Sequence, residues 1–535
     1  MAGQDIAGLP QPDGPSPADT ALKITSGRLR LLGALAILTS TLICYWPAVR
    51  GDFVWDDDRH VSENRNLRDL PGLERIWFRV GATPQYYPMT HTSFWIENHL
   101  WGLRPTGYHL TNILLHAVNA VLLWKLLEML EVPGAFLAAA VFALHPVNVE
   151  SVAWISERKN VLAMGFALAS MIVFLQGTTT RSYVASLVLF VCALLSKTVV
   201  ATAPAVLLVI LWWKQDGPHP NPPPEYQGRG QKALPLLIPF FVLGIAAGVV
   251  TAVMEHSYVG ARGPDWQFSF IDRGLIAGRA VCFYVGKVLL PMKLTFSYAR
   301  WEIDPRVWWQ WIFPFAVVVV LIAAWLSRER LGRGVIAALL IFVGTLFPAL
   351  GFINTYPMRY SFVADHFVYE SAPALIALVV AGLVMLLGRA AVPVAVLLVA
   401  VLGALTWNQA HIFAGPESLW RDTIAKNPTS WMARHNLAVC LSAWSDRDRD
   451  AGDIAEARQK LQESLELFDQ VHALRPQHEK LPINRAIAER KLKLLDEPDD
   501  TGTLLDVGLL LARSARTAEA VQPLERYVTL KPDDA

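Results

Sequence analysis

The sequence predicts an all-α, polytopic membrane protein with about eleven transmembrane helices and a C-terminal domain of helical repeats. Of its 535 residues 53% are hydrophobic and only 17% are charged, which would leave a soluble protein with more apolar surface than its core could bury. The apolar residues also form blocks of roughly 20 residues, the length that crosses a bilayer. The polar region after these blocks repeats with a helical period.

The N-terminal region predicts a disordered cytoplasmic tail, residues 1 to 28, rich in Pro, Gly, Asp and Ala. The apolar run that follows ends in Trp46-Pro47 and is longer than the core of a signal peptide. We therefore interpret it as a retained first span, which opens a membrane domain of residues 29 to 410. With the N-terminus inside, the loop of residues 50 to 106 lies outside.

The apolar stretch of residues 274 to 291 allows two interpretations, because it also carries Arg279 and Lys287. If it crossed the membrane, the arginines between positions 328 and 333 would lie outside, against the rule that basic residues gather in cytoplasmic loops. We prefer a helix along the outer interface. An odd number of crossings then places the C-terminal domain, residues 411 to 535, outside. The ten spans expected after the first lie near residues 107–128, 134–150, 160–177, 183–195, 198–213, 234–254, 307–326, 335–353, 371–388 and 391–408.

The C-terminal domain carries a sequence repeat. Gly508, Ala520 and Pro532 fall twelve residues apart, and the Pro-Asp-Asp triplet at Pro532 also occurs 34 residues earlier. This is the period of a tetratricopeptide repeat, in which small residues lie where two antiparallel helices pack. A looser unit spans residues 427 to 476, with an expected insertion around 445 to 453. Such repeats bind peptides or protein partners.

Three consecutive carboxylates, Asp56, Asp57 and Asp58, lie in the first outer loop. A partly buried carboxylate beside like charges has a raised pKa and can act as a general base. We therefore nominate Asp56 and Asp57 as catalytic, with a solvated acidic turn as the alternative. Lysines and arginines on the outer side contradict the charge rule, so a function explains them better than anchoring does.

Metal and nucleic-acid chemistry are not expected. Histidines are plentiful, but no pair stands at i, i+4 with a neighbouring glutamate, the spacing of a zinc helix. The 47 basic and 46 acidic residues give no net field for nucleic acid. We predict neither a metal nor a cofactor.

Seven short segments occur in an order shared with a known family: Gly51 to Asp57, Tyr86 to Thr90, Gly107 to Asn112, Leu144 to Pro146, Leu195 to Thr198, Leu294 to Tyr298, and Ala364 to Tyr369. In this order the chain resembles the transmembrane and tetratricopeptide-repeat O-mannosyltransferases and their bacterial relatives, which are lipid-linked glycosyltransferases of the GT-C class. It departs from the family pattern at Tyr87 and His366, where arginine is usual, and at Thr198, where glutamate is usual.

The resemblance implies transfer of a sugar, such as mannose, from a polyprenyl-phosphate donor to an acceptor hydroxyl, with inversion. Asp56 would accept the hydroxyl proton and Asp57 would orient or share it, while cations would hold the phosphate. The candidate phosphate-binding residues are Arg158, Lys159, Lys197, Arg359 and His366. The candidate substrate-binding residues are Tyr87, His91, His109, His116, His145, Glu150, Asp365 and Tyr369.

The expected partners are the polyprenyl-phosphate sugar, membrane lipid, and an acceptor protein or peptide held by the repeats. The expected location is the inner membrane of a bacterium, with the active site and the repeats on the periplasmic side. Two alternatives stay open. A flippase or permease for a lipid-linked sugar would favour charges inside the spans, and a repeat scaffold for envelope assembly would not need Asp56 and Asp57.

Overall fold

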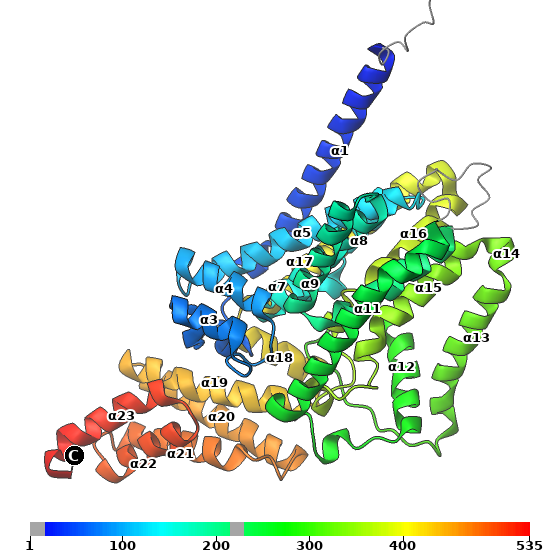
Figure 1. Ribbon diagram of the computed structural model, residues 1–535. Helices are drawn as coiled ribbons and strands as arrows, with labels where there is room; N and C mark the ends of the chain where they lie inside the picture. Colours follow the sequence, from blue (N-terminus) through cyan, green and yellow to red (C-terminus); the bar gives the residue numbers. More distant parts are fainter. Residues whose placement is uncertain (1–16, 215–228, 535) are drawn as a thin grey trace, which may run out of the picture.

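The computed structural model describes residues 17 to 214 and 229 to 534, and every regular element in these two ranges is a helix. Long apolar helices form a membrane body, and a layer of shorter, polar helices lies against one end of it (Figure 1). The predicted all-α membrane protein with C-terminal repeat helices is thereby confirmed.

Helix α1 (Pro17–Cys44) begins earlier than the sequence predicted. Residues 17 to 28, assigned above to a disordered tail, belong to this helix, and residues 1 to 16 lie outside the described ranges. Leu31, Leu32 and Leu35 are exposed on its surface, as expected of side chains that face lipid.

Six helical stretches of the described chain are long and apolar enough to cross a membrane, or seven if a bent pair is counted as one span. Three shorter apolar stretches accompany them. One of the six, Ala372–Ala414, has 43 residues, about twice the roughly 20 that one crossing needs. It contains two helices that turn at Gly388, where φ is +53°. The count of eleven crossings stays a prediction. The helices are α5 (Pro105–Met129), α6 (Ala135–Ala143), α7 (Val149–Ala153), α8 (Arg158–Gln176), α9 (Thr180–Ser196), α10 (Ala203–Lys214), α11 (Arg229–Met254), α13 (Ile312–Leu326), α15 (Arg333–Leu346), α16 (Ala372–Leu387) and α17 (Ala391–Ala410).

Different structural elements lie at the two ends of the membrane body. Helix α14 (Arg328–Leu331) and the turn between α16 and α17 lie at one end (Figure 1). Helices α3 (Leu70–Phe78) and α4 (Pro88–Trp101) of the first loop lie at the other end, with the repeats (Figure 1). This is the arrangement that the predicted topology requires.

Helix α12 (Phe270–Leu289) covers the ambiguous basic segment and packs against α13. A Cβ atom at Gly278 would lie 2.5 Å from the Cα of Pro314, so the two helices meet without a side chain between them. The guanidinium of Arg279 lies 4.4 Å from the ring centroid of Trp301. The interfacial orientation of α12 stays a prediction.

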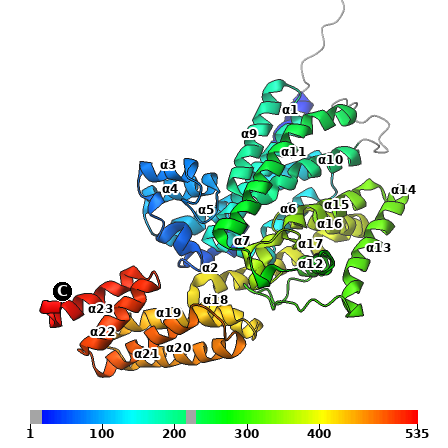
Figure 2. The ribbon, with the colours of Figure 1, turned by 60° about the horizontal axis from the view of Figure 1, so that its bottom comes forward.

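The repeat layer consists of antiparallel helices (Figure 2). A Cβ atom at Gly508 would lie 2.4 Å from Cδ2 of Leu524, so glycine permits the close crossing that the sequence predicted. Residues 445 to 453 form no separate loop, because they lengthen α19 and join it to α20. The helices are α18 (Pro416–Lys426), α19 (Trp431–Asp450), α20 (Ile454–Leu474), α21 (Leu481–Asp496), α22 (Thr501–Arg513) and α23 (Thr517–Leu530).

The first repeat helices are fixed to the membrane domain. Lys426 Nζ donates to the carbonyl of Leu294 at 2.8 Å, and Asn427 Nδ2 donates to the carbonyl of Ser297 at 2.9 Å. The buried ring of Trp420 lies 5.3 Å from that of Trp55, the residue before Asp56. The repeat layer therefore borders the carboxylate loop.

Candidate active site

Asp57 anchors the carboxylate loop. Its carboxylate accepts hydrogen bonds from the backbone N–H of Val54 at 2.9 Å and of Ser156 at 2.7 Å. The side chain is fully buried, and burial raises the pKa of Asp57 to about 8 although both hydrogen bonds oppose the shift. Asp57 thus ties the loop to the start of α8.

Asp57 makes stability depend on pH. An unfolded aspartate titrates near 3.9, so between about pH 4 and pH 8 the folded protein binds the extra proton, and its free energy of unfolding falls as pH rises. Asp57→Asn should flatten this slope, measured by denaturant unfolding in detergent at several pH values. Asp52→Asn, at an exposed site in the same loop, should leave the slope unchanged. A slope that survives Asp57→Asn would contradict the assignment.

Asp56 has a different environment. It follows Trp55, whose φ of +50° is rare for a residue with a large side chain. Asp56 is partly exposed, and although its backbone carbonyl accepts from the His60 N–H, its carboxylate accepts no hydrogen bond from the described residues. Burial raises the pKa of Asp56, and the positive charges of Lys159 and Arg59 oppose the rise. Its carboxylate is therefore free to take a proton from a ligand.

Lys159 and Glu157 lie close to Asp56, and Lys197 pairs with the same glutamate. Lys159 Nζ is 2.8 Å from one carboxylate oxygen of Glu157, and Lys197 Nζ is 3.1 Å from the other. Lys197 also donates to Oδ1 of Asn160. The helices break at both places: a 3-10 turn ends at Glu157, and α9 ends just before Lys197. Two ammonium groups share the one carboxylate of Glu157, so each keeps N–H donors that can bind an anion.

Lys197→Met should raise the KM for a phosphate-bearing donor about tenfold or more, the effect of losing one charge-assisted contact. The measurement is the initial transfer rate against donor concentration. Lys460→Met, in the repeats and ion-paired with Asp448, is the matched control and should leave this KM unchanged. An unchanged donor KM in Lys197→Met would make the lysine a purely structural partner of Glu157.

Arg158 lies elsewhere, and the structure contradicts its assignment to the phosphate site. It is completely buried and pairs with both carboxylate oxygens of Glu97, at 2.8 and 3.1 Å. Its remaining N–H groups bond to side-chain or backbone oxygens of Ser93, Tyr108 and Asn112. All five donors are used within the protein, so none is left for a phosphate.

His366 pairs with Glu150, and its ring lies near Trp154. Its Nδ1 lies 2.9 Å from Oε1 of Glu150, and its backbone N–H donates to Oε2 at 3.0 Å. The ring is 5.7 Å from Trp154, which also lies 5.6 Å from Lys159 Nζ. The next acid, Asp365, accepts a hydrogen bond from the hydroxyl of Tyr298 at 2.8 Å.

The other proposed substrate-binding residues separate into two groups. Tyr87 and His91 belong to the loop side, where His91 Nε2 is 3.3 Å from Nδ1 of His60 and burial lowers the pKa of His91 to about 4. The second group joins helices instead. His116 bonds to the Tyr369 hydroxyl at 2.8 Å and to the Ala143 carbonyl, His145 bonds to the Val288 carbonyl, and His109 lies beside Gly51.

Arg359 is not among the groups around Lys159. Its Nε lies 3.3 Å from Oδ2 of Asp265, in a separate cavity beside the repeats. The structure contradicts its assignment to the same site as the two lysines. Sequence reasoning also missed Glu157, Asn160 and His60; a lone acid beside basic residues at a span end was the available signal for Glu157.

An apolar groove of about 570 Å³ lies near Lys197. Val200 and Thr202, just after Lys197, line it together with Glu370. Burial raises the pKa of Glu370 to about 7, and the charge of Lys197 opposes the rise. The groove continues along α5, α8, α10, α15 and α16 to Lys214 at the end of α10. It can accept a long apolar chain whose polar end stays near Lys197.

Metal binding has no support in the described residues, where no three His, Cys, Asp or Glu side chains are grouped to hold an ion.

Part of the chain is similar to curated proteins. It is 33% identical over 153 residues to protein O-mannosyl-transferase TMTC2 of Mus musculus, which is 26% of this chain and 18% of that protein. It is 30% identical over 170 residues to protein O-mannosyl-transferase F38B6.6 of Caenorhabditis elegans, 29% of this chain and 25% of that protein. It is 29% identical over 163 residues to human TMTC4, 26% of this chain and 22% of that protein.

This chain is a relative of the protein O-mannosyl-transferases. The suspected family relation is confirmed, and the matched stretches cover at most a quarter of each of these three relatives. No protein-family model matches the chain, and no solved structure matches it.

Proposed function

We propose that this protein transfers a sugar, mannose by analogy with its relatives, from a polyprenyl-phosphate donor to Ser or Thr of a protein. The observation that carries the proposal is the partly exposed Asp56 carboxylate near Lys159, with Lys197 on the same glutamate as Lys159 and an apolar groove close to Lys197. The names of the relatives supply the sugar and the protein acceptor.

The groove favours a lipid-linked donor over a nucleotide sugar. Its lining is mostly aliphatic, and a polyprenyl chain would bury apolar surface there. The phosphate at the head of that chain would lie near Lys159 and Lys197, which would stabilise the charge that develops as the anomeric C–O bond breaks.

Asp56 is the proposed base. As the acceptor oxygen attacks the anomeric carbon, its proton passes to Asp56 and polyprenyl phosphate leaves from the opposite face, so the configuration inverts. No covalent enzyme intermediate is needed. Asp57 fixes the loop that presents Asp56, through its bonds to Val54 and Ser156.

We place this site on the extracytoplasmic face, in a bacterium the periplasmic side of the inner membrane. The arginines of α14 lie at the opposite end of the body (Figure 1), and basic residues favour the cytoplasm. A flippase is the weaker alternative, because the ionisable cluster lies where helices break at one end of the spans and not along their middle. A scaffold protein would not require an Asp56 carboxylate that can accept a proton near lysine side chains.

The test is to incubate purified protein in detergent with a panel of polyprenyl-phosphate sugars and a Thr-containing peptide, and to measure release of polyprenyl phosphate together with glycosylated peptide. We expect both products in equal amounts with at least one donor, and about 10²-fold less of both with Asp56→Asn. Transport of the donor across a vesicle membrane without product would support the flippase instead.

A further inference from the structure

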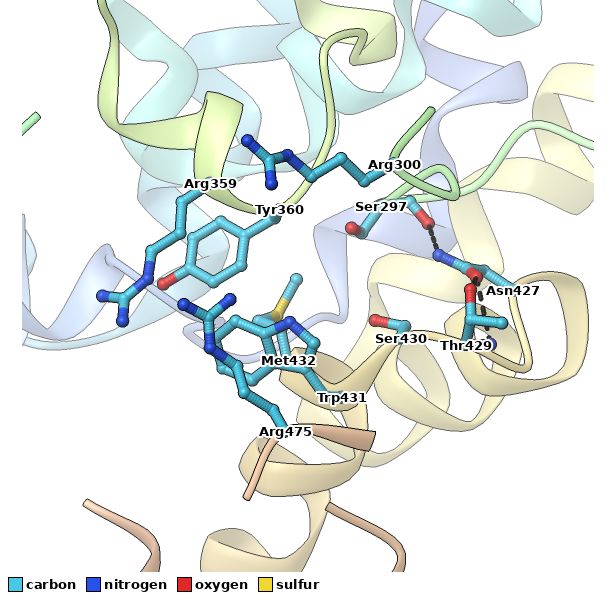
Figure 3. Close-up of a pocket in the computed structure, with 10 residues that line it drawn as sticks. All are labelled: Ser297, Arg300, Arg359, Tyr360, Asn427, Thr429, Ser430, Trp431, Met432 and Arg475. Atoms are coloured by element: carbon cyan, nitrogen blue, oxygen red, sulfur yellow. Dashed lines mark hydrogen bonds between the residues drawn. The ribbon is translucent and has the colours of Figure 1, made fainter. Parts of the chain in front are cut away.

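A second cavity, of about 240 Å³, lies between the membrane domain and the first repeat helices (Figure 3). Both domains line it, so whatever fills it contacts both. The membrane domain contributes Ser297, Arg300, Arg359 and Tyr360, and the repeat domain contributes Asn427, Thr429, Ser430, Trp431, Met432 and Arg475.

The cavity has an excess of positive charge. Arg475 Nη2 lies 2.7 Å from Oδ2 of Asp265, Arg359 Nε lies 3.3 Å from the same oxygen, and Arg300 Nη1 lies 3.8 Å from Oδ1. One carboxylate is thus shared by three guanidinium groups, and none of the described residues that line the cavity is acidic. Ser430 caps the N-terminus of α19, which adds a partial positive charge at the same wall.

Aromatic rings give the cavity a flat wall. Figure 3 shows the side chains of Arg300, Arg359 and Arg475 arranged around Tyr360 and Trp431. The rings of Tyr360 and Trp431 have centroids 5.3 Å apart, and the guanidinium of Arg475 lies 4.8 Å from the ring of Trp431. Guanidinium groups held in this way are oriented to bind a planar carboxylate with paired hydrogen bonds.

The cavity is also close to the proposed base. The ring of Tyr360 lies 6.3 Å from that of Trp55, the residue before Asp56. One aromatic layer therefore separates the cavity from the carboxylate loop. Since an extended chain advances about 3.3 Å per residue, this separation corresponds to roughly two residues of a bound peptide.

We propose that this cavity binds an acidic side chain of the acceptor polypeptide and so places a Ser or Thr roughly two residues away at Asp56. The inference rests on the proposed function. A polypeptide is favoured over the donor phosphate because six of the ten lining residues come from the repeat domain, and such repeats bind peptides. The donor phosphate already has Lys159 and Lys197 as its proposed partners.

The test uses two synthetic peptides with one central Thr, one carrying Glu two residues to either side and its twin carrying Gln there. Binding to the full-length protein in detergent is measured by fluorescence anisotropy, without donor. We expect the Glu peptide to bind about tenfold more tightly. Arg300→Gln and Arg475→Gln should remove this difference, whereas Arg421→Gln, at an exposed ion pair with Glu463 outside the cavity, should preserve it.

A second variant distinguishes a ligand-binding role of the three arginines from a role that only holds the two domains together. Asp265→Asn removes the carboxylate that competes for the arginines, so the Glu peptide should bind several-fold more tightly and the Gln peptide should not. If the arginines only join the two domains, Asp265→Asn weakens the binding of both peptides alike, and the proposal is overturned.

The proposal is also overturned if the arginine variants raise the donor KM equally with both peptides, because the cavity would then hold the lipid phosphate. Charge-dependent binding without any sugar transfer would reject the proposed function and leave the cavity assignment intact.

Discussion

Asp56→Asn lowers sugar transfer about 10²-fold or more while the donor still binds, because the amide keeps the shape of the side chain but cannot accept a proton. Asp56 is the position where this loss is expected, since its carboxylate is partly exposed and faces Lys159. The measurement is kcat with saturating donor, together with donor binding at equilibrium. Transfer should also fall with decreasing pH as Asp56 becomes protonated, at a pH above the ordinary range of an aspartate because burial raises its pKa.

The neighbouring carboxylates are matched controls. Asp58 is exposed and bonds to the hydroxyl of Ser62, so Asp58→Asn should change transfer by less than about threefold, as expected of a surface substitution. Asp57→Asn should act through the position of the loop and through stability. Equal and mild losses of transfer activity at all three positions, in folded protein that still binds the donor, would favour the alternative that the loop is only a solvated acidic turn.

The sequence predicted the fold class well because apolar block length and the 34-residue repeat are local signals. It also assigned Asp56, Lys159 and Lys197 to one site, and their roles stay predictions; Lys159 lies near Asp56, and Lys197 shares Glu157 with Lys159. All three are polar residues at or beside span ends on one side of the membrane, and antiparallel spans bring such ends together. Regular α-helix is interrupted at Glu157 and at Lys197. The sequence pattern does not show how these breaks orient the two side chains.

Adjacent basic residues were the main source of error. Arg158 and Lys159 are neighbours in the sequence, but successive side chains on a helix point about 100° apart. Lys159 therefore faces Glu157 and Asp56, whereas Arg158 faces Glu97. The partner of Arg158 lies 61 positions earlier in the chain, and no local pattern connects the two. Arg359 was misplaced for a similar reason, since its partner Asp265 is also distant in sequence.

Arg158→Met should lower the free energy of unfolding by about 3 to 5 kcal/mol, the usual loss when one partner of a buried ion pair is removed. Glu97 has 5% of its side chain exposed, and both of its oxygens pair with Arg158. The substitution therefore leaves a buried carboxylate without a counter-charge. The check is denaturant unfolding in detergent. Arg30→Met, whose ion pair with Glu128 is mostly exposed, should cost less than about 1 kcal/mol.

The double variant Glu97→Leu/Arg158→Met decides between a structural arginine and a phosphate ligand. Removing both charges should restore most of the lost stability, because no unpaired charge remains; Asn112 and the Tyr108 carbonyl still lose a donor, so recovery is incomplete. In this stabilised double variant the donor KM should stay within about twofold of that of the unsubstituted protein, because Lys159 and Lys197 are unchanged. A tenfold higher donor KM in the stable double variant would mean that Arg158 reaches the phosphate after all, and the five internal hydrogen bonds would then have to open when the donor binds.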